Sequence, residues 1–318
     1  MKSIASNNRN RTLQKSERAR KRLSIEPIVF HTINYILLAG LCVFMLYPML
    51  NTLAISFNDG LDAVRGGIGI WPRVFSLQNY QTVFRMSTLI NAFYITVART
   101  IIQTIANLIV TSMLAYALSR KEFVFRRPIA IIFVITMYFH AGLIPHFILI
   151  QSLGLLDSFH VYWIPTMISA FNLIILRTYM RSIPEALTES AKLDGASDFR
   201  VYWQIIMPLT KPALATIALF VAVGAWNSWF DAFIFNGGSP HLSVLQFELQ
   251  RLLSSAMMQG QTGGQASQAA QAGLGLAMVT PQSLRAAVAI VASVPILLVY
   301  PFLQRYFVHG VQLGGVKE

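Results

Sequence analysis

The sequence is poor in cysteine and in charge. Cys42 is the only cysteine among 318 residues and lies in the first long apolar run. The sequence therefore predicts no disulfide within the chain, no zinc knuckle and no thiol catalysis. Charged residues make up 12% of the chain and hydrophobic residues 55%, whereas soluble domains are about 25% charged. This composition predicts a membrane protein.

The sequence also lacks the motifs of the common catalytic sites. It contains no glycine-rich phosphate loop ending in Lys and Ser or Thr, no nucleophile elbow and no metalloprotease signature. His140 and His146 are six residues apart, so they do not share a helix face, and no carboxylate accompanies them. The sequence therefore predicts a non-enzyme, with no catalytic site, no metal site and no cofactor in this chain.

Long uncharged runs are abundant. Six of them approach or exceed the roughly 20 residues that cross a bilayer as a helix. They lie at residues 27–58, 100–119, 128–156, 158–176, 212–230 and 286–304. We expect the second span to begin near Thr88 and to contain Arg99. No segment alternates polar and apolar residues as a membrane barrel requires, so we predict an all-α membrane protein with six transmembrane helices.

The formal net charge of +12 indicates a membrane topology. If the N-terminus is cytoplasmic, most of the 25 Lys and Arg residues lie on the cytoplasmic side, including those of the basic tail at residues 1–27 and of the turn at 120–127. The arginines on the outer side are Arg65, Arg73, Arg85 and Arg251. Lys and Arg are enriched in cytoplasmic loops. We therefore expect both termini inside, and contacts with anionic lipids instead of nucleic acid.

Two segments depart from simple spans. Gly142 and Pro145 interrupt the third apolar run, where we expect the helix to kink or unwind and to line a pathway. Residues 254–279 contain a tract of Gln, Gly and Ala and are predicted to form a flexible extracytoplasmic insertion within the transmembrane domain, residues 28–318.

A polar island separates the fourth and fifth apolar runs. Ser182 and Glu185 have the spacing of a capping box, and Pro184 suits a first helical turn, so we predict that a short helix begins there. Glu189 precedes Lys192 by three residues and is placed to pair with it.

A second short helix should follow. Gly195 supplies a left-handed stop for the first helix, and Ser197 can cap the next one. Two short helices at an angle predict a cytoplasmic protrusion.

The stretch ESAKLDGASDFRVYWQIIMP resembles the cytoplasmic signature of permease subunits of bacterial ABC importers. The matching positions are Glu189, Ala191, Gly195, Ile205 and Pro208, and Asp194 and Ala196 complete the Asp-Gly-Ala common among sugar importers. Ser190 and Met207 depart from the signature by small changes in size.

The stretches FHAGLIPHFILIQSLGLLDS, GAWNSWFDAF and YPFLQRYFVHGVQLGGVK resemble the maltose-type permease family, in the branch of lipoprotein-associated oligosaccharide permeases. The resemblance implies a type I ABC importer fold in the inner membrane, with a coupling helix in the loop at residues 182–208. It also implies a heterodimer with a second permease, an ATPase homodimer that binds ATP and Mg, an extracytoplasmic solute-binding protein, and an oligosaccharide substrate such as a pectin or alginate fragment.

Several residues are candidates for lining the substrate pathway. Aromatic faces beside hydrogen-bonding groups suit a sugar. The candidates are Trp226, Asn227, Trp229 and Asp231 in the fifth run, and Tyr138 and His140 beside the break in the third. Packing between helices explains the fifth-run cluster almost as well.

Three ionisable residues lie at or near membrane depth, namely Arg99, Asp231 and Arg285. Such residues are functional candidates, but a structural ion pair or a position at the interface is the favoured alternative. Arg99 and Arg285 would favour an acidic sugar, but they do not decide between an acidic and a neutral one. The alternative functions left open are an ABC permease for a non-sugar solute, an ion-coupled secondary transporter, and a membrane-embedded enzyme.

Overall fold

The computed structural model describes residues 25–139, 141–261 and 279–310. Helices and short turns make up these ranges, in which the only strand-like pairing is an isolated bridge between Asn58 and Phe75. The predicted all-α architecture is therefore confirmed for the described residues. Most of the basic tail, residues 262–278 of the expected insertion, and His140 lie outside them.

The elements follow one another along the chain with short connections. The first half contains α2 (Ile25–Ser56), α3 (Gly60–Val64), α4 (Gln78–Arg85), α5 (Ser87–Ser119), α6 (Arg126–Tyr138), α7 (Leu143–Ser152), η1 (Phe159–Tyr162) and α8 (Ala170–Arg181). The second half contains α9 (Glu185–Leu193), α10 (Asp198–Val201), η2 (Tyr202–Ile206), α11 (Met207–Leu209), α12 (Lys211–Asn227), α13 (Phe230–Phe235), η3 (Pro240–Leu242), α14 (Leu245–Gln261) and α16 (Pro281–Gly310). The helix α14 extends into the range expected as an insertion.

Not every apolar run forms one straight helix. Among the described residues, Val29–Ser56, Ser87–Ser119 and Pro281–Val299 are long and apolar enough to cross a membrane, and the pair Asp198–Leu209 and Lys211–Asn227 also qualifies but is bent by 78°. The fourth run is divided between η1 and α8, because Pro165 disfavours helical backbone in the residue before it. The third run is divided between α6 and α7.

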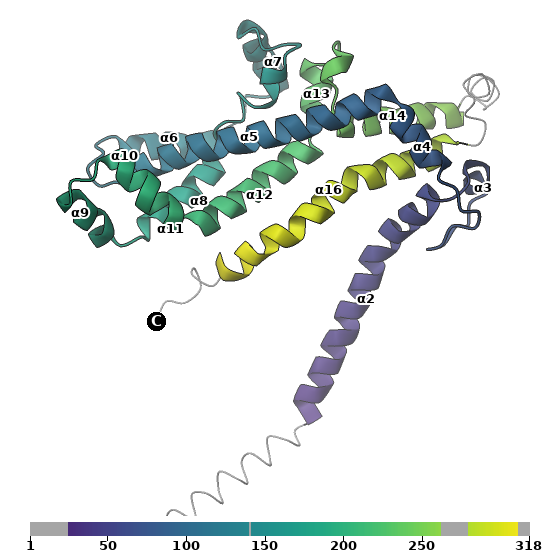
Figure 1. Cartoon of the computed structure of the whole chain (residues 1–318), viewed down its shortest axis with the longest axis horizontal. Helices are drawn as coiled ribbons and strands as arrows, with labels where there is room; N and C mark the ends of the chain where they lie inside the picture. Colours follow the sequence, from purple (N-terminus) through teal and green to yellow (C-terminus); the bar gives the residue numbers. More distant parts are fainter. Residues whose placement is uncertain (1–24, 140, 262–278, 311–318) are drawn as a thin grey trace, which may run out of the picture.

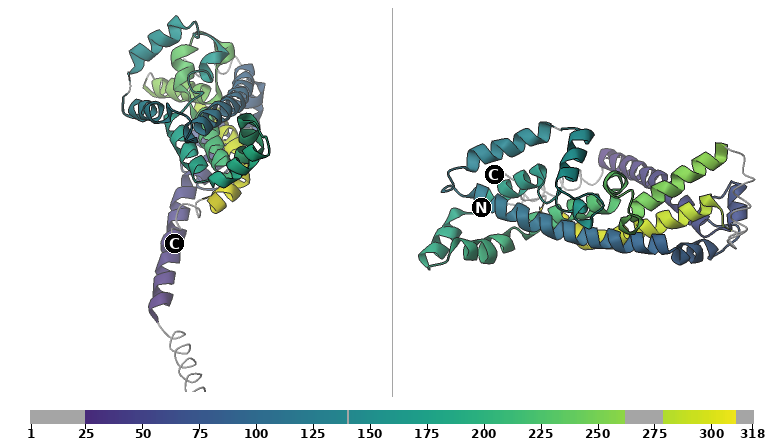
Figure 2. Two further views of the ribbon diagram at one scale, coloured as in Figure 1. Left: turned by 90° about the vertical axis from the view of Figure 1, so that its left-hand side faces the viewer. Right: turned by 90° about the horizontal axis from the view of Figure 1, so that it is seen from above.

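The helix α5 runs along most of the long axis of the molecule (Figure 1). It ends beside α9 and α10, whereas α3 and α4 lie at the opposite end, and α2 leaves the body at an angle (Figures 1 and 2). The helix α5 packs mainly against α8 and α12. Apolar side chains of α2 remain exposed along its length.

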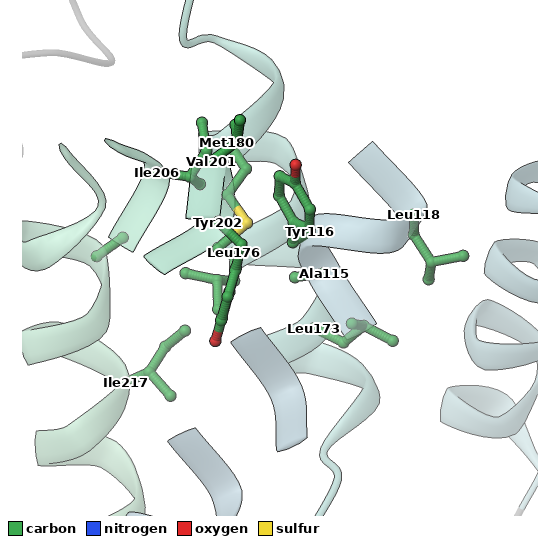
Figure 3. Close-up of a cluster of buried hydrophobic side chains, with 11 residues drawn as sticks. Ala115, Tyr116, Leu118, Leu173, Leu176, Met180, Val201, Tyr202, Ile206 and Ile217 are labelled. Carbon is green, nitrogen blue, oxygen red and sulfur yellow. The ribbon is translucent and has the colours of Figure 1, made fainter. Parts of the chain in front are cut away.

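Two buried apolar clusters lie toward opposite ends of α5. One joins α5, α8, α12 and the α10–η2 segment (Figure 3). The other joins α4, α5, α14 and α16, with Val83, Leu89 and Leu284 among its buried members. Both clusters hold α5 against its neighbours.

Asn79 connects three segments at the end of the molecule opposite α9. Its buried amide donates to the carbonyls of Ser56 (2.9 Å) and Asn58 (2.8 Å). Its carbonyl accepts from the hydroxyl of Ser283 at 2.8 Å. Asn79 therefore ties the end of α2 and the start of α16 to α4.

The substitution Asn79→Leu should destabilise this end of the protein. Three hydrogen bonds are lost and buried carbonyls stay unpaired, so we expect the free energy of unfolding to fall by about 2 to 4 kcal/mol. Thermal unfolding of the detergent-purified protein measures the effect. The control is Gln81→Leu, which changes an exposed residue of the same helix. Equal melting temperatures for the two variants would contradict the assignment.

Candidate functional site

The first helix of the 182–208 loop begins at Glu185, after Pro184. Pro184 is the N-cap residue and makes no side-chain cap. The hydroxyl of Ser182 instead donates to the carbonyl of Tyr179 at 2.7 Å, and Ser182 is the C-cap residue of α8. The capping box predicted for Ser182 and Glu185 is therefore wrong, because the preceding helix uses Ser182 as its own C-cap.

The turn between α9 and α10 has the predicted backbone. Gly195 adopts φ +81°, and the amide of Ala196 donates to the carbonyl of Ala191 at 2.9 Å. The hydroxyl of Ser197 accepts from the amide of Arg200 at 3.4 Å and caps α10. The left-handed stop at Gly195 and the cap at Ser197 are both confirmed.

The charged groups of the loop pair differently from the prediction. Lys192 binds Asp198 at 3.0 Å and lies 3.7 Å from Glu122, and it does not pair with Glu189. Its hydrogen bond to Asp198 raises the pKa of Lys192. Lys121 binds Glu185 at 2.7 Å. Exposed pairs of this kind contribute little to stability, so packing must hold the loop in place.

The α10–η2 segment packs deeply against α5 (Figure 3). Val201, Tyr202 and Ile206 are buried among side chains of α5, α8 and α12. The hydroxyl of Tyr202 lies 2.7 Å from that of Ser112 on α5, and its ring lies 5.3 Å from the ring of Tyr116. The second half of the loop is thus seated on α5.

The end of the loop forms an elbow. Pro208 has no amide hydrogen, and just before it the chain makes the wider π turn of η2, with the amide of Met207 donating to the carbonyl of Tyr202. Ile205 is half-buried within η2. The 78° bend to α12 follows at Thr210. Ile205 and Pro208, at the end of the signature, therefore lie just before the point where the loop turns away from α12.

The signature residues in the first half of the loop fall into two groups. Ala191 and Ala196 pack against the core, whereas Glu189, Asp194 and Gly195 are exposed at the surface. The first group shapes the protrusion, and the second offers the larger surface to a partner.

The exposure of four large apolar side chains on the loop was missed by the sequence reasoning. They are Leu187, Leu193, Phe199 and Trp203, and Leu193, beside the Gly195 turn, is 89% exposed. Apolar residues gathered on a protrusion are typical of a protein interaction surface. The signal in the sequence was their presence within a polar island.

A second candidate region is the break in the fifth apolar run. The helix α12 ends at Asn227, Ser228 is extended, and α13 begins at Phe230. The side chain of Arg99, fully buried, enters this break from α5 and binds Asp231 at 3.1 Å. It also donates to the carbonyl of Ser228 at 2.6 Å and to that of Ala225.

These contacts distinguish between the readings left open for the arginines. Arg99 also lies over the ring of Tyr162, 5.0 Å from its centroid, and has no exposed surface with which to contact a ligand. It is a structural ion-pair residue in this structure. Arg285 is half-buried, donates to the carbonyl of Pro281 at 3.0 Å, and pairs with no carboxylate in the described part of the chain.

The side chain of Trp226 has other contacts than the remaining candidates of the fifth run. It is buried, its indole N–H donates to the carbonyl of Ala292 at 2.9 Å, and its ring meets that of Phe93 edge-on. These contacts favour helix packing against α16 as its role.

The other three candidates of the fifth run each keep exposed surface at the break between α12 and α13, which we call its exposed edge. Asn227 is exposed and accepts from Gln246 at 3.3 Å, and the side chain of Asp231 is 27% exposed. Trp229 is half-buried beside the ring of Phe233. The edge therefore presents an amide, a carboxylate and aromatic rings.

The break predicted in the third run is confirmed. Gly142 has φ +86° and separates α6 from α7. Tyr138, at the end of α6, is 80% exposed. The rings of His146 and Phe147 on α7 contact that of Phe235 on α13, so the helices that follow the two breaks pack against each other.

Comparisons with known proteins agree with this architecture. A profile of the family described as "Binding-protein-dependent transport system inner membrane component" matches residues 128–313. The polygalacturonan/rhamnogalacturonan transport system permease protein YtcP of Bacillus subtilis (strain 168) is 36% identical over 290 residues, covering 91% of this chain and 98% of that protein. Protein LplC of the same organism is 34% identical, covering 91% and 95%.

A solved structure also resembles the chain closely. It belongs to a bacterial ABC transporter involved in the import of the acidic polysaccharide alginate. The TM-score is 0.81 at 29% identity, and the match covers 89% of this chain and 98% of that one.

Substitutions at Gly195 should follow backbone preference instead of size. A Cβ at this position would have no neighbour within 4 Å, so the cost comes from the positive φ alone, about 1 to 2 kcal/mol for most residues and less for Asn. We expect the melting temperature to fall least for Gly195→Asn, more for Gly195→Ala and most for Gly195→Val. Gly69→Ala, at an exposed position without positive φ, is the control. A decrease that ignored this order would show that the left-handed turn is not what requires glycine.

Proposed function

Because this chain belongs to the family of binding-protein-dependent transport system inner membrane components, we propose that it is a permease subunit of an ATP-driven ABC importer for an oligosaccharide. The observation that carries the proposal is the 182–208 loop, which projects at one end of α5 and is seated on it by buried packing. A partner that moves this loop would move α5 with it.

The partner of the loop is an ATPase in this proposal. Since the chain has no phosphate loop, ATP and Mg bind to the separate ATPase homodimer. The exposed residues Glu189, Asp194 and Leu193 enter a groove of that subunit, while Ala191, Ala196, Ile205 and Pro208 shape the loop. Closure of the ATPase dimer then switches the permease as a rigid body between inward-open and outward-open states.

The remaining partners follow from the importer reading. A second permease forms the heterodimer, and the exposed apolar surface of α2 is available to it and to lipid. An extracytoplasmic solute-binding protein delivers the sugar. The distribution of Lys and Arg supports a cytoplasmic 182–208 loop and cytoplasmic termini.

The substrate class rests on the relatives and on the exposed edge of the fifth-span break. The name of YtcP refers to polygalacturonan and rhamnogalacturonan, and the solved structure belongs to an importer of the acidic polysaccharide alginate. Asn227, Trp229 and Asp231 contact the sugar in this proposal, with Tyr138 and His140 of the third run lining the same route. Oligogalacturonate is the first substrate to test.

The substitution Leu193→Glu should separate the ATPase from the permease. It places a charge on a side chain that is 89% exposed and that is buried in the ATPase groove of the complex. We expect at least a tenfold loss of ATPase copurifying with this chain from native membranes in mild detergent, measured by quantitative mass spectrometry. The second permease should copurify unchanged, because the heterodimer does not depend on Leu193.

The matched control is Gln204→Glu, which makes the same charge change at an exposed residue of η2. It should retain the ATPase. Recovery of the wild-type chain without any ATPase, together with transport by the chain alone, would refute the importer assignment. Normal ATPase recovery with Leu193→Glu would refute the docking surface only.

A further inference from the structure

Arg99 lies where the fifth apolar run changes from α12 to α13. Its side chain has no exposed surface, although it carries a charge and comes from the long apolar helix α5. A charge removed from water persists only where its partners offset the desolvation cost. The partners of Arg99 therefore indicate what this residue holds in place.

The hydrogen-bond partners of Arg99 all lie at the break between α12 and α13. One terminal nitrogen donates to the carbonyls of Ala225 and Ser228, and the other donates to Asp231. Carbonyls in the last turn of a helix have no amide partner within that helix and form the negative end of its dipole. The guanidinium supplies the missing donors, so one side chain of α5 joins the last turn of α12 to the first turn of α13.

We propose that Arg99 is the positioning residue of the substrate pathway, fixing the break so that Asn227, Trp229 and Asp231 keep their places on its exposed edge. This inference rests on the proposed function, because it takes that edge to line the route of the sugar. Arg99 does not touch the sugar. It acts through the backbone of Ala225 and Ser228.

The geometry requires arginine and not only a positive charge. Asp231 already accepts from the hydroxyl of Ser228 at 2.8 Å and from the amide of Ala232 at 3.0 Å, so its carboxylate keeps other donors without Arg99. The carbonyls lose their side-chain donor. A planar guanidinium reaches two carbonyls and a carboxylate at once, whereas the compact ammonium of lysine cannot span them.

The test uses thiol reactivity at the break. Ala232, buried in α13, is changed to cysteine in a Cys42→Ser background, and its labelling by N-ethylmaleimide is timed in the detergent-purified complex. A second reporter, Ala115→Cys, lies in the buried cluster around Tyr202 and monitors general unfolding. The proposal predicts that Arg99→Met accelerates labelling at the Ala232 reporter at least tenfold and leaves the Ala115 reporter slow.

Two further variants separate charge from geometry. Arg99→Lys should give intermediate labelling at the Ala232 reporter, because the pair with Asp231 survives and the carbonyl contacts do not. Arg285→Met, which removes another arginine at membrane depth, should label at the parent rate.

The outcomes are decisive in both directions. Parent-rate labelling of the Ala232 reporter in Arg99→Met would overturn the proposal. Equal acceleration at both reporters would also overturn it, because Arg99 would then serve general packing. These readouts need no transported sugar, so they stand apart from the importer assignment.

A transport readout then addresses the pathway itself. In proteoliposomes holding the complete importer, Arg99→Lys should lower oligogalacturonate uptake per ATP hydrolysed at least threefold, while Arg285→Met matches the parent. An unchanged ratio in Arg99→Lys would overturn the role in the pathway. A parent importer that moves no oligogalacturonate would instead count against the proposed substrate.

Discussion

The packing of α5 is the constraint on which the rest of the structure depends. This helix of 33 residues extends about 50 Å and meets both candidate regions. At one end, Ser112 and Tyr116 receive Tyr202 of the 182–208 loop. Farther along, Arg99 enters the break between α12 and α13. A displacement of the loop cannot be absorbed locally, because a well-packed core transmits it to α5.

Polar residues fix the position of α5 among its neighbours. Thr96 accepts from the amide of Leu245, and Asn107 donates to the carbonyl of Thr166. At membrane depth no water competes for these groups, so an unpaired one is costly and each pairing selects one register. The same reasoning explains Arg99, whose charge is tolerated because the break offers it a carboxylate and free carbonyls. An apolar helix could slide along its neighbours, but this one cannot.

Turns and helix caps were predictable from the sequence. Contacts that depend on residues far apart in the chain, or on which of two helices binds a side chain, were not. Gly142, Gly195 and Ser197 behave as expected because left-handed turns and caps depend on a few adjacent residues. The expected cap by Ser182 failed because Tyr179 of the preceding helix takes its hydroxyl. The burial of Arg99 depends on Asp231, which is 132 positions away. The exposure of Leu193 could not be predicted, because it depends on which apolar residues the tertiary packing buries.

The central claim is that the 182–208 loop and α5 move as one body when the ATPase partner closes. Spin labels at Ser190 on α9 and Tyr94 on α5, both exposed, would measure it by pulsed electron resonance in the reconstituted complex with Cys42→Ser. The account predicts that ATP binding changes this distance by less than about 2 Å while distances to the second permease change by more. A shift within the chain of about 5 Å or more would contradict it, because the loop would then move without α5.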